Sequence, residues 1–239
     1  MKTLLPAMLA AALLPAFAPA HQASEADTAV PAYVTRAIND PARQPDKADD
    51  ARRKIAAVMT FAEVKPGDEV LELAPGSGYW TRVFSAIVGS SGHVYTVWPN
   101  EFMKHSSKSY ANWQSLVKTP HYANVSLLKE PGTQLSAPKP VDLVFTSQNY
   151  HDYHNFPSSN AIAKFNKQVF DVLKPGGLYV IIDHVAPAGS GLRDTDTLHR
   201  IDPAVVKKEV EAAGFVFDGA SDALHNPNDP HTNIVFDES

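Results

Sequence analysis

The sequence predicts an α/β fold in which helices cover both faces of a parallel β-sheet. Short apolar segments alternate along the chain with amphipathic ones, and this alternation is typical of parallel strands joined by helices. One apolar segment, residues 69–73, leads directly through a glycine turn into a helix-like segment. The chain has 239 residues and a hydrophobic content of 44%, enough for one sizeable domain.

The N-terminal residues predict export. Lys2 precedes an apolar stretch over residues 4–17, and Ala18-Pro19-Ala20 supplies a small-residue cleavage site. These three parts are typical of a secretory signal peptide, so we expect residues 1–20 to be removed near Ala20. The mature protein is then periplasmic or secreted, with no stable membrane insertion. Residues 21–45 form an N-terminal extension, and the main domain is expected over residues 46–239.

The elements of that chain follow in order. We expect helices over residues 29–38, 46–61, 79–88, 101–118, 158–173 and 202–213, and strands over residues 69–73, 93–98, 125–128, 141–146, 178–182 and 215–217. Adjacent charges at residues 52–54 are interpreted as a solvated helix face. Only residues 234–236 remain for a last antiparallel strand. That strand is therefore short or missing, which leaves an exposed sheet edge.

Composition excludes several classes of protein. The formal net charge is −5, and no basic run occurs, so we expect no nucleic-acid partner. The absence of cysteine excludes disulfides, thiolate catalysis and cysteine-based zinc sites. No Gly-x-Ser-x-Gly motif is present, which argues against a serine hydrolase. The sequence does not indicate an oligomeric state.

The glycine turn after the first strand is the strongest functional signal. Gly76 and Gly78 permit positive φ angles and a close approach of a ligand to the backbone. Glu72 places a carboxylate inside an apolar strand, which is costly unless the group is used. Tyr79 follows Gly78, which excludes a Walker A loop, and Thr81 stands where a dinucleotide fingerprint has its third glycine.

The remaining interpretation of the glycine turn rests on its resemblance to a known family of enzymes. Residues 72–78, Glu-Leu-Ala-Pro-Gly-Ser-Gly, resemble the first motif of class I S-adenosylmethionine (SAM)-dependent methyltransferases, with Ala74 in place of the usual first glycine. Lys-Pro-Gly-Gly at residues 174–177 resembles a turn that recurs in the same proteins. The resemblance implies a Rossmann-like class I methyltransferase fold with SAM as cofactor. The candidate cofactor-binding residues are Glu72, Ala74, Pro75, Gly76, Gly78, Trp98, Glu101 and Glu130.

Polar residues after the later strands predict the acceptor side of the site, because ligands bind at the carboxyl ends of parallel strands. The candidate catalytic residues are Asn149, Tyr150, His151, Asp152 and His184. His151 or His184 is a candidate general base, oriented by Asp152 or Asp183. The prolines that follow Asn in the fourth motif of some families are missing, so an amino-group acceptor is not implied.

Two other interpretations of these histidines stay open. One is that His151, Asp152, His154, Asp183 and His184 hold a divalent metal. The acid–base interpretation is preferred, because His-Asp-x-His on a loop is not a specific ligand spacing, and no metal is expected. The other is that these histidines have no functional role and occur here because polar loops are often rich in histidine.

The segments 149–154, 183–184, 199–202 and 226–231 together resemble a family of predicted exported bacterial methyltransferases. This resemblance implies methyl transfer from SAM to a small-molecule acceptor that the sequence does not identify. Because SAM is made in the cytosol, two alternatives remain. One is an exported module that binds a nucleoside-like ligand, and the other is a His/Asp metal-dependent enzyme on the same fold.

Overall fold

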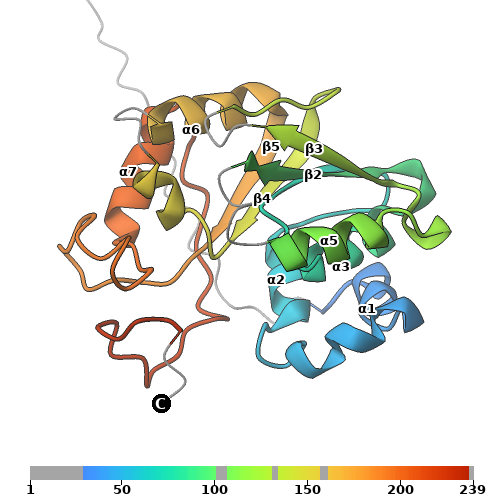
Figure 1. Ribbon diagram of the computed structural model, residues 1–239, viewed down its shortest axis with the longest axis horizontal. Coiled ribbons are helices and arrows are strands. Elements are labelled where there is room, and N and C mark those ends of the chain that lie inside the picture. The colour runs from blue at the N-terminus through green and yellow to red at the C-terminus, as the bar shows by residue number, and fades with distance from the viewer. Residues whose placement is uncertain (1–28, 101–106, 131–133, 157–160, 237–239) are drawn as a thin grey trace, which may run out of the picture.

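The computed structural model describes residues 29–100, 107–130, 134–156 and 161–236, and a parallel sheet lies at its centre (Figure 1). Among these residues the sheet has five strands in the order β3-β2-β1-β4-β5. Their bounds are β1 Glu69–Leu73, β2 His93–Pro99, β3 Val125–Glu130, β4 Val141–Ser147 and β5 Leu173–Ile182. Every pair of neighbouring strands runs in parallel, so the carboxyl ends of all five meet at one edge.

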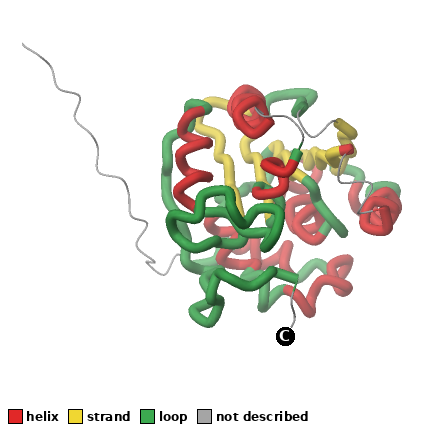
Figure 2. Tube along the Cα trace, turned by 60° about the vertical axis from the view of Figure 1, so that its left-hand side comes forward, coloured by secondary structure: helices red, strands yellow, loops and turns green. Residues whose placement is uncertain are grey.

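Helices cover both faces of the sheet, as predicted (Figure 2). Along β1, Val70 faces a core built with helices α1 Ala32–Ile38, α2 Ile55–Phe61, α3 Tyr79–Val88 and α5 Ser107–Leu116. Leu71 and Leu73 face the opposite core, which contains residues of α6 Ala161–Val172 and of the 3₁₀-helix η4 His151–Asn155. This division follows from the two-residue period of a strand. The α/β fold class is confirmed.

The remaining helical segments are short or peripheral. They are the 3₁₀-helices η1 Pro41–Asp49, η2 Gly89–Ser91 and η3 Pro120–Tyr122, and the helix α7 Pro203–Ala212, which packs against α6. The α7 helix begins as predicted, with the Asp202 carboxylate accepting from the Ala204 N–H at 2.9 Å. No helix among the described residues is long and apolar enough to cross a membrane.

The predicted continuous helix over residues 46–61 is wrong. The chain forms η1 up to Asp49 and resumes as α2 at Ile55, with Lys54 between them at a left-handed φ of 46°. The extension before residue 46 also shares the core of the domain, because α1 packs against α3 and buries Val34 completely. Residues 1–28, which include the expected signal peptide, lie outside the described residues.

The Lys-Pro-Gly-Gly segment is a bulge within β5, which begins at residue 173 and not at 178 as predicted. The register passes from Val141 opposite Leu173 to Leu143 opposite Leu178. At Gly177 an added Cβ would lie 3.0 Å from the Asp142 carbonyl oxygen, so a side chain is disfavoured there. The four residues 174–177 lie opposite the single residue Asp142, so β5 is three residues longer than β4 across this bulge.

The predicted sixth strand is also wrong. Residues 215–217 form no strand, and the Phe215 ring packs against Phe170 and Tyr179 at ring distances of 5.2 and 5.5 Å. Val216 points outward with 89% of its surface exposed. Residues 234–236 form no strand either, so the described sheet ends at β5.

Candidate functional site

The turn between β1 and α3 adopts the conformation that its glycines predict. Gly76 and Gly78 have φ angles of 58° and 82°, and Ala74 keeps the left-handed conformation of the usual glycine at 47°. The Ala74 N–H donates to the Val97 carbonyl at 2.8 Å, which ties the turn to β2. A Cβ added to Gly76 would meet no atom within 4 Å, so the space beside it is open.

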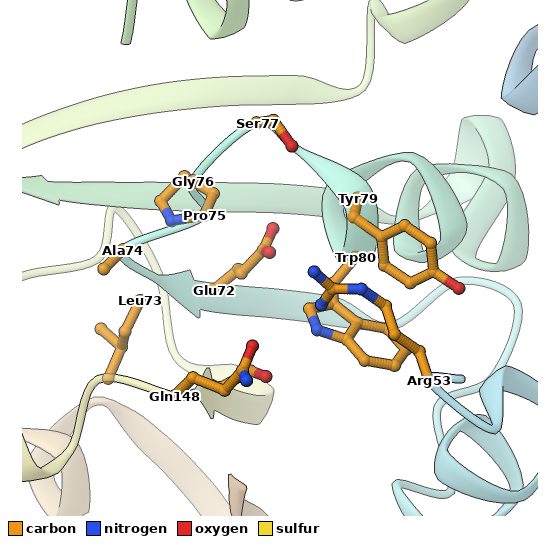
Figure 3. A pocket seen from close by; sticks show the side chains of 11 residues that line it. Arg53, Glu72, Leu73, Ala74, Pro75, Gly76, Ser77, Tyr79, Trp80 and Gln148 are labelled. Atoms are coloured by element: carbon orange, nitrogen blue, oxygen red, sulfur yellow. The ribbon is translucent and has the colours of Figure 1, made fainter. Parts of the chain in front are cut away.

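That open space belongs to a cavity of about 110 Å³ at the carboxyl end of β1 (Figure 3). Its lining comes from the turn, from the start of α3, from the end of β4 and from the segment before α2. The lining residues are Arg53, Glu72, Leu73, Ala74, Pro75, Gly76, Ser77, Tyr79, Trp80, Ser147 and Gln148. Of the candidate cofactor-binding residues, the structure therefore brings Glu72, Ala74, Pro75 and Gly76 together. Gly78 lies just outside the lining as the N-cap of α3.

Glu72 is the one acid in this lining, and only 2% of its surface is exposed. Its carboxyl accepts a short hydrogen bond from the Thr81 hydroxyl. Burial raises the pKa of Glu72 to about 8, although the Thr81 hydrogen bond and the charges of Arg82 and Arg53 oppose this shift. At neutral pH the group is therefore mostly protonated, and a cationic ligand would favour its charged form.

Arg53 is the cation of the cavity, and the prediction that it lies on a solvated face is wrong. Its guanidinium group lies 4.5 Å from the Tyr79 ring centre and 5.8 Å from that of Trp80. Its Nε is buried and has no hydrogen-bond partner among the described residues. Figure 3 shows the side chain reaching over the Trp80 ring, with its charged end on the side of Glu72.

A second layer of polar contacts holds the turn in place. Arg82 donates to both carboxylate oxygens of Asp46 in η1, and also to the Ser77 carbonyl at 3.0 Å. The Tyr79 hydroxyl donates to Asp50 at 2.7 Å. The segment before α2 therefore positions both the glycine turn and the ring on which Arg53 lies.

The other cofactor-binding candidates lie elsewhere. Trp98 is 1% exposed, packs edge-on against Tyr110 in the core and does not line the cavity. The Glu130 carboxylate accepts from the N–H and the hydroxyl of Ser136 and does not line the cavity. Glu101 lies outside the described residues. Conversely, Ser147 and Gln148 line the cavity and were missed, although both stand at the carboxyl end of β4.

Beyond Gln148, a cluster of histidines and acids occupies the same edge of the sheet. His151 Nδ1 lies 2.8 Å from an oxygen of Asp183, and His151 Nε2 lies 3.3 Å from Asp152 and 3.2 Å from His199 Nδ1. Burial lowers the pKa of His151, but the hydrogen bonds to Asp152 and Asp183 outweigh it and raise the pKa to about 9. Without a metal, this imidazole is charged at neutral pH.

His184 contacts Gln148, one of the residues that line the cavity. Its Nε2 lies 2.8 Å from the Gln148 side-chain nitrogen, and because an amide nitrogen only donates, Nε2 accepts. Burial lowers the pKa of His184, so the ring is neutral at neutral pH. Of the two candidate bases, His184 has the protonation state that a base requires.

Asn149 and Tyr150 hold the loop together. The Asn149 amide donates to the carbonyls of Ser147 and Leu73 at 3.0 and 3.4 Å, joining the ends of β4 and β1. Tyr150 is fully buried, and its hydroxyl bonds Asn166 and Glu209. His154, a candidate metal ligand, pairs with the same Glu209 at 3.1 Å and does not converge with His151, Asp152 and His199.

The closing segment, residues 213–236, returns to this edge, where Arg200 holds it. The guanidinium group is 4% exposed and donates to Asp229 through two nitrogens at 2.8 and 2.9 Å, to the Asn233 carbonyl and to the Val185 carbonyl. The Phe236 ring lies edge-on to His199 with ring centres 4.8 Å apart. Residues far apart in sequence are thereby fixed beside the histidine cluster.

A parallel sheet whose central strand contains a buried acid and leads into a glycine turn defines a class I SAM-dependent methyltransferase. Comparison with known protein families agrees with this class and identifies one family within it. The chain belongs to the ubiE/COQ5 methyltransferase family, which it matches over residues 49–199.

Curated relatives carry two different names. The chain is 28% identical over 163 residues to a protein-L-isoaspartate O-methyltransferase of Methanococcus aeolicus, covering 68% of this chain and 65% of the relative. It is 29% identical over 140 residues to the ubiquinone/menaquinone biosynthesis C-methyltransferase UbiE of Vibrio cholerae, covering 56% of this chain and 49% of the relative. The chain thus spans 65% of the length of the first relative and 49% of the second, less than two thirds of either.

Solved structures share the fold alone. The [4+2]-cyclase SpnF superposes with a TM-score of 0.53 at 17% identity, covering 68% of this chain and 56% of that one. A putative sarcosine dimethylglycine methyltransferase of Galdieria sulphuraria superposes with a TM-score of 0.51 at 14% identity, covering 74% and 66%.

Proposed function

We propose that the protein transfers a methyl group from SAM to a small-molecule acceptor. The observation that carries this proposal is the cavity at the carboxyl end of β1. There a buried acid, an arginine whose Nε lacks a partner among the described residues, and an open glycine turn lie together. Membership of the ubiE/COQ5 family supports the same cofactor.

The residues present fit the charged part of SAM. Its methionine moiety carries a carboxylate, which would pair with Arg53, and an ammonium group, which would pair with Glu72 as a carboxylate. The turn at Gly76 lets the backbone approach the ligand, since no Cβ fills that space. The cavity is smaller than the usual ligand pocket of roughly 300–1,000 Å³, so it takes only part of the molecule. Bound SAM supplies an electrophilic methyl group on a sulfonium.

On the acceptor side, His184 is the general base of this proposal. It is neutral, and its Nε2 lone pair accepts a hydrogen bond from Gln148 of the cavity lining, which the acceptor would displace to reach the base. The names of the relatives indicate a protein-borne carboxyl group in one case and a quinone precursor in the other. We favour a small molecule with an ionisable group within reach of His184.

Calorimetry with SAM and with S-adenosylhomocysteine tests the cofactor. We expect saturable binding of both, and no heat with either at high protein concentration would refute the proposal. Gly76→Ala should weaken binding at least tenfold, because its Cβ enters the cavity. Gly191→Ala is the matched control, since Gly191 also has a positive φ of 61° and open space around it but lies outside the lining.

The base is tested separately, with His184→Gln. Removing a general base should lower turnover by roughly 10²–10⁴-fold while the affinity for SAM stays within a factor of two or three. His151→Gln should not show this separation, because His151 is charged at neutral pH. A loss of SAM affinity in His184→Gln, with turnover per bound cofactor unchanged, would assign His184 to cofactor binding.

We also propose that residues 1–20 direct export to the periplasm or outside the cell and are then removed. The support is the order of Lys2, the apolar stretch and Ala18-Pro19-Ala20. Intact mass of the protein from a periplasmic fraction should correspond to a chain that begins near His21. A full-length chain retained in the cytosol would contradict export.

A further inference from the structure

We propose that His151, Asp152 and His199 form a binding site for a divalent transition metal such as Zn²⁺. One ligand atom of each residue converges on the same point. His151 Nε2 lies 3.2 Å from His199 Nδ1 and 3.3 Å from an oxygen of Asp152, and the third side, from His199 Nδ1 to the same oxygen, is 3.6 Å. Two imidazoles and a carboxylate are a ligand set found in zinc and non-haem iron sites.

The size of this triangle suits a metal. A zinc ion lies about 2.0–2.2 Å from nitrogen and oxygen ligands, so its ligand atoms stand roughly 3.0–3.6 Å apart in tetrahedral or octahedral arrangements. All three observed separations fall in that range. Small rotations of the two partly exposed side chains, Asp152 and His199, would complete the coordination.

Asp183 supplies a second, independent feature of a metal site. One of its oxygens lies 2.8 Å from His151 Nδ1, and the other accepts the His151 backbone N–H at 2.9 Å. With the Nδ1 proton directed to Asp183, the lone pair of Nε2 faces Asp152 and His199. A carboxylate that holds the far nitrogen of a histidine is the usual outer partner of a metal-ligating imidazole.

The site is accessible from one side. The His151 side chain is 3% exposed, whereas those of Asp152 and His199 are 28% and 29% exposed, so an ion can enter without unfolding. The remaining coordination positions would be open to water or to an oxygen donor of a second ligand. Asp183 directly precedes His184, whose Nε2 bonds Gln148 of the cavity lining, so the metal site is linked to the cavity through these side chains.

The alternative is a metal-free ion pair in which a charged His151 bonds Asp152. Zinc titration of the full-length protein, followed by dialysis and metal analysis, distinguishes the two. We expect one tightly held ion per chain in the wild type and a loss of affinity of at least 100-fold in His199→Ala and in Asp152→Asn. His121→Ala is the control, because it removes a half-exposed histidine that pairs with Asp40 outside the cluster.

The Asp183→Asn variant distinguishes a true set of metal ligands from an accidental grouping of the same side chains. It should weaken zinc binding by roughly 10–100-fold without abolishing it, as expected for an outer partner. Cobalt substitution should give the visible absorption of a low-coordinate nitrogen–oxygen site in the wild type, and this should vanish in His199→Ala. Equal affinity in the wild type and in both ligand variants, or no binding by a folded wild type, would overturn the proposal.

Should Asp152→Asn fail to fold by circular dichroism, His199→Asn, at the other partly exposed ligand, provides the same comparison. None of these measurements uses SAM, so an absence of metal would leave methyl transfer intact, and an absence of SAM binding would leave the metal site intact.

Discussion

Glu72 shows how a single buried group links binding to stability. Its folded-state pKa of about 8 lies above the ordinary value of 4.5, so the folded chain keeps a proton that the unfolded chain loses between these values. Over that window the native state binds more protons, and the free energy of unfolding therefore falls as pH rises. The contribution of Glu72 is fully present below pH 4.5 and is lost as pH passes 8.

We therefore expect Glu72→Gln to flatten the pH dependence of stability. In the absence of ligand the variant should exceed the wild type at pH 8, with a difference on the order of a few kcal/mol that shrinks toward pH 5. Urea unfolding of both proteins at pH 5, 6.5 and 8 measures it. Parallel profiles across this range would show that the carboxyl is not buried as the structure places it. The same variant should lose affinity for SAM.

Arg53 and His199 show the limit of sequence analysis at the residue scale. Arg53 stands in a run of three charged residues, and its place in the cavity depends on the left-handed turn at Lys54 and on its contact with Tyr79. No local sequence pattern predicts either the turn at Lys54 or the contact with Tyr79. His199 belongs to a segment that was noted for a family resemblance, and its contact with His151 requires the folded loop before α7.

At the scale of the element, the turn after β1 was well predicted because its glycines are local signals. The open question was Ala74, which stands where a glycine is usual. The structure keeps this residue left-handed at a φ of 47°, a conformation that costs an L-residue roughly 1–2 kcal/mol. The turn is retained because a hydrogen bond to β2 and the brace from Arg82 hold it.

Substitutions at Ala74 should reveal this strain. Ala74→Gly should leave SAM affinity nearly unchanged and shift stability by under about 1 kcal/mol, because relief of strain and the added backbone entropy oppose each other. Ala74→Val should lower the free energy of unfolding by about 2 kcal/mol, since a β-branched residue is strongly disfavoured there.

Denaturant unfolding measures both, with Ala111→Val as the control on the exposed surface of α5. The control should cost only about 0.5 kcal/mol, the difference in helix propensity. Equal losses at the two positions would contradict a strained turn.

For the whole molecule, the alternation of apolar and amphipathic segments predicted the five parallel strands and the helices on both faces. Convergence of strand ends predicted that His151 and Asp183 would lie together, and they do. The sixth strand was wrong for a physical reason. Gly214, at a φ of 111°, turns the chain after α7, and Phe215 then packs on Phe170 and Tyr179 and does not enter the sheet.

The closing segment is held by side chains where a strand was expected, so it should depend on them. Asp229→Asn leaves the buried Arg200 with a weaker partner and should lower the free energy of unfolding by about 1–3 kcal/mol. Limited proteolysis should then cleave after residue 213 earlier than in the wild type. Asp222→Asn, at an exposed position of the same segment, is the control and should leave the cleavage rate unchanged.

The contact between Phe236 and His199 has a practical consequence for handling the protein. Phe236, which contacts a proposed metal ligand, stands three residues before Ser239, so a tag fused after Ser239 would be attached within a few residues of that contact. A C-terminal polyhistidine tag would introduce competing imidazoles next to His199 and could carry nickel from a purification column into the cluster. An affinity tag without histidine, or one that is cleaved off, would ensure that any metal found with the protein is bound by its own residues and not by the tag.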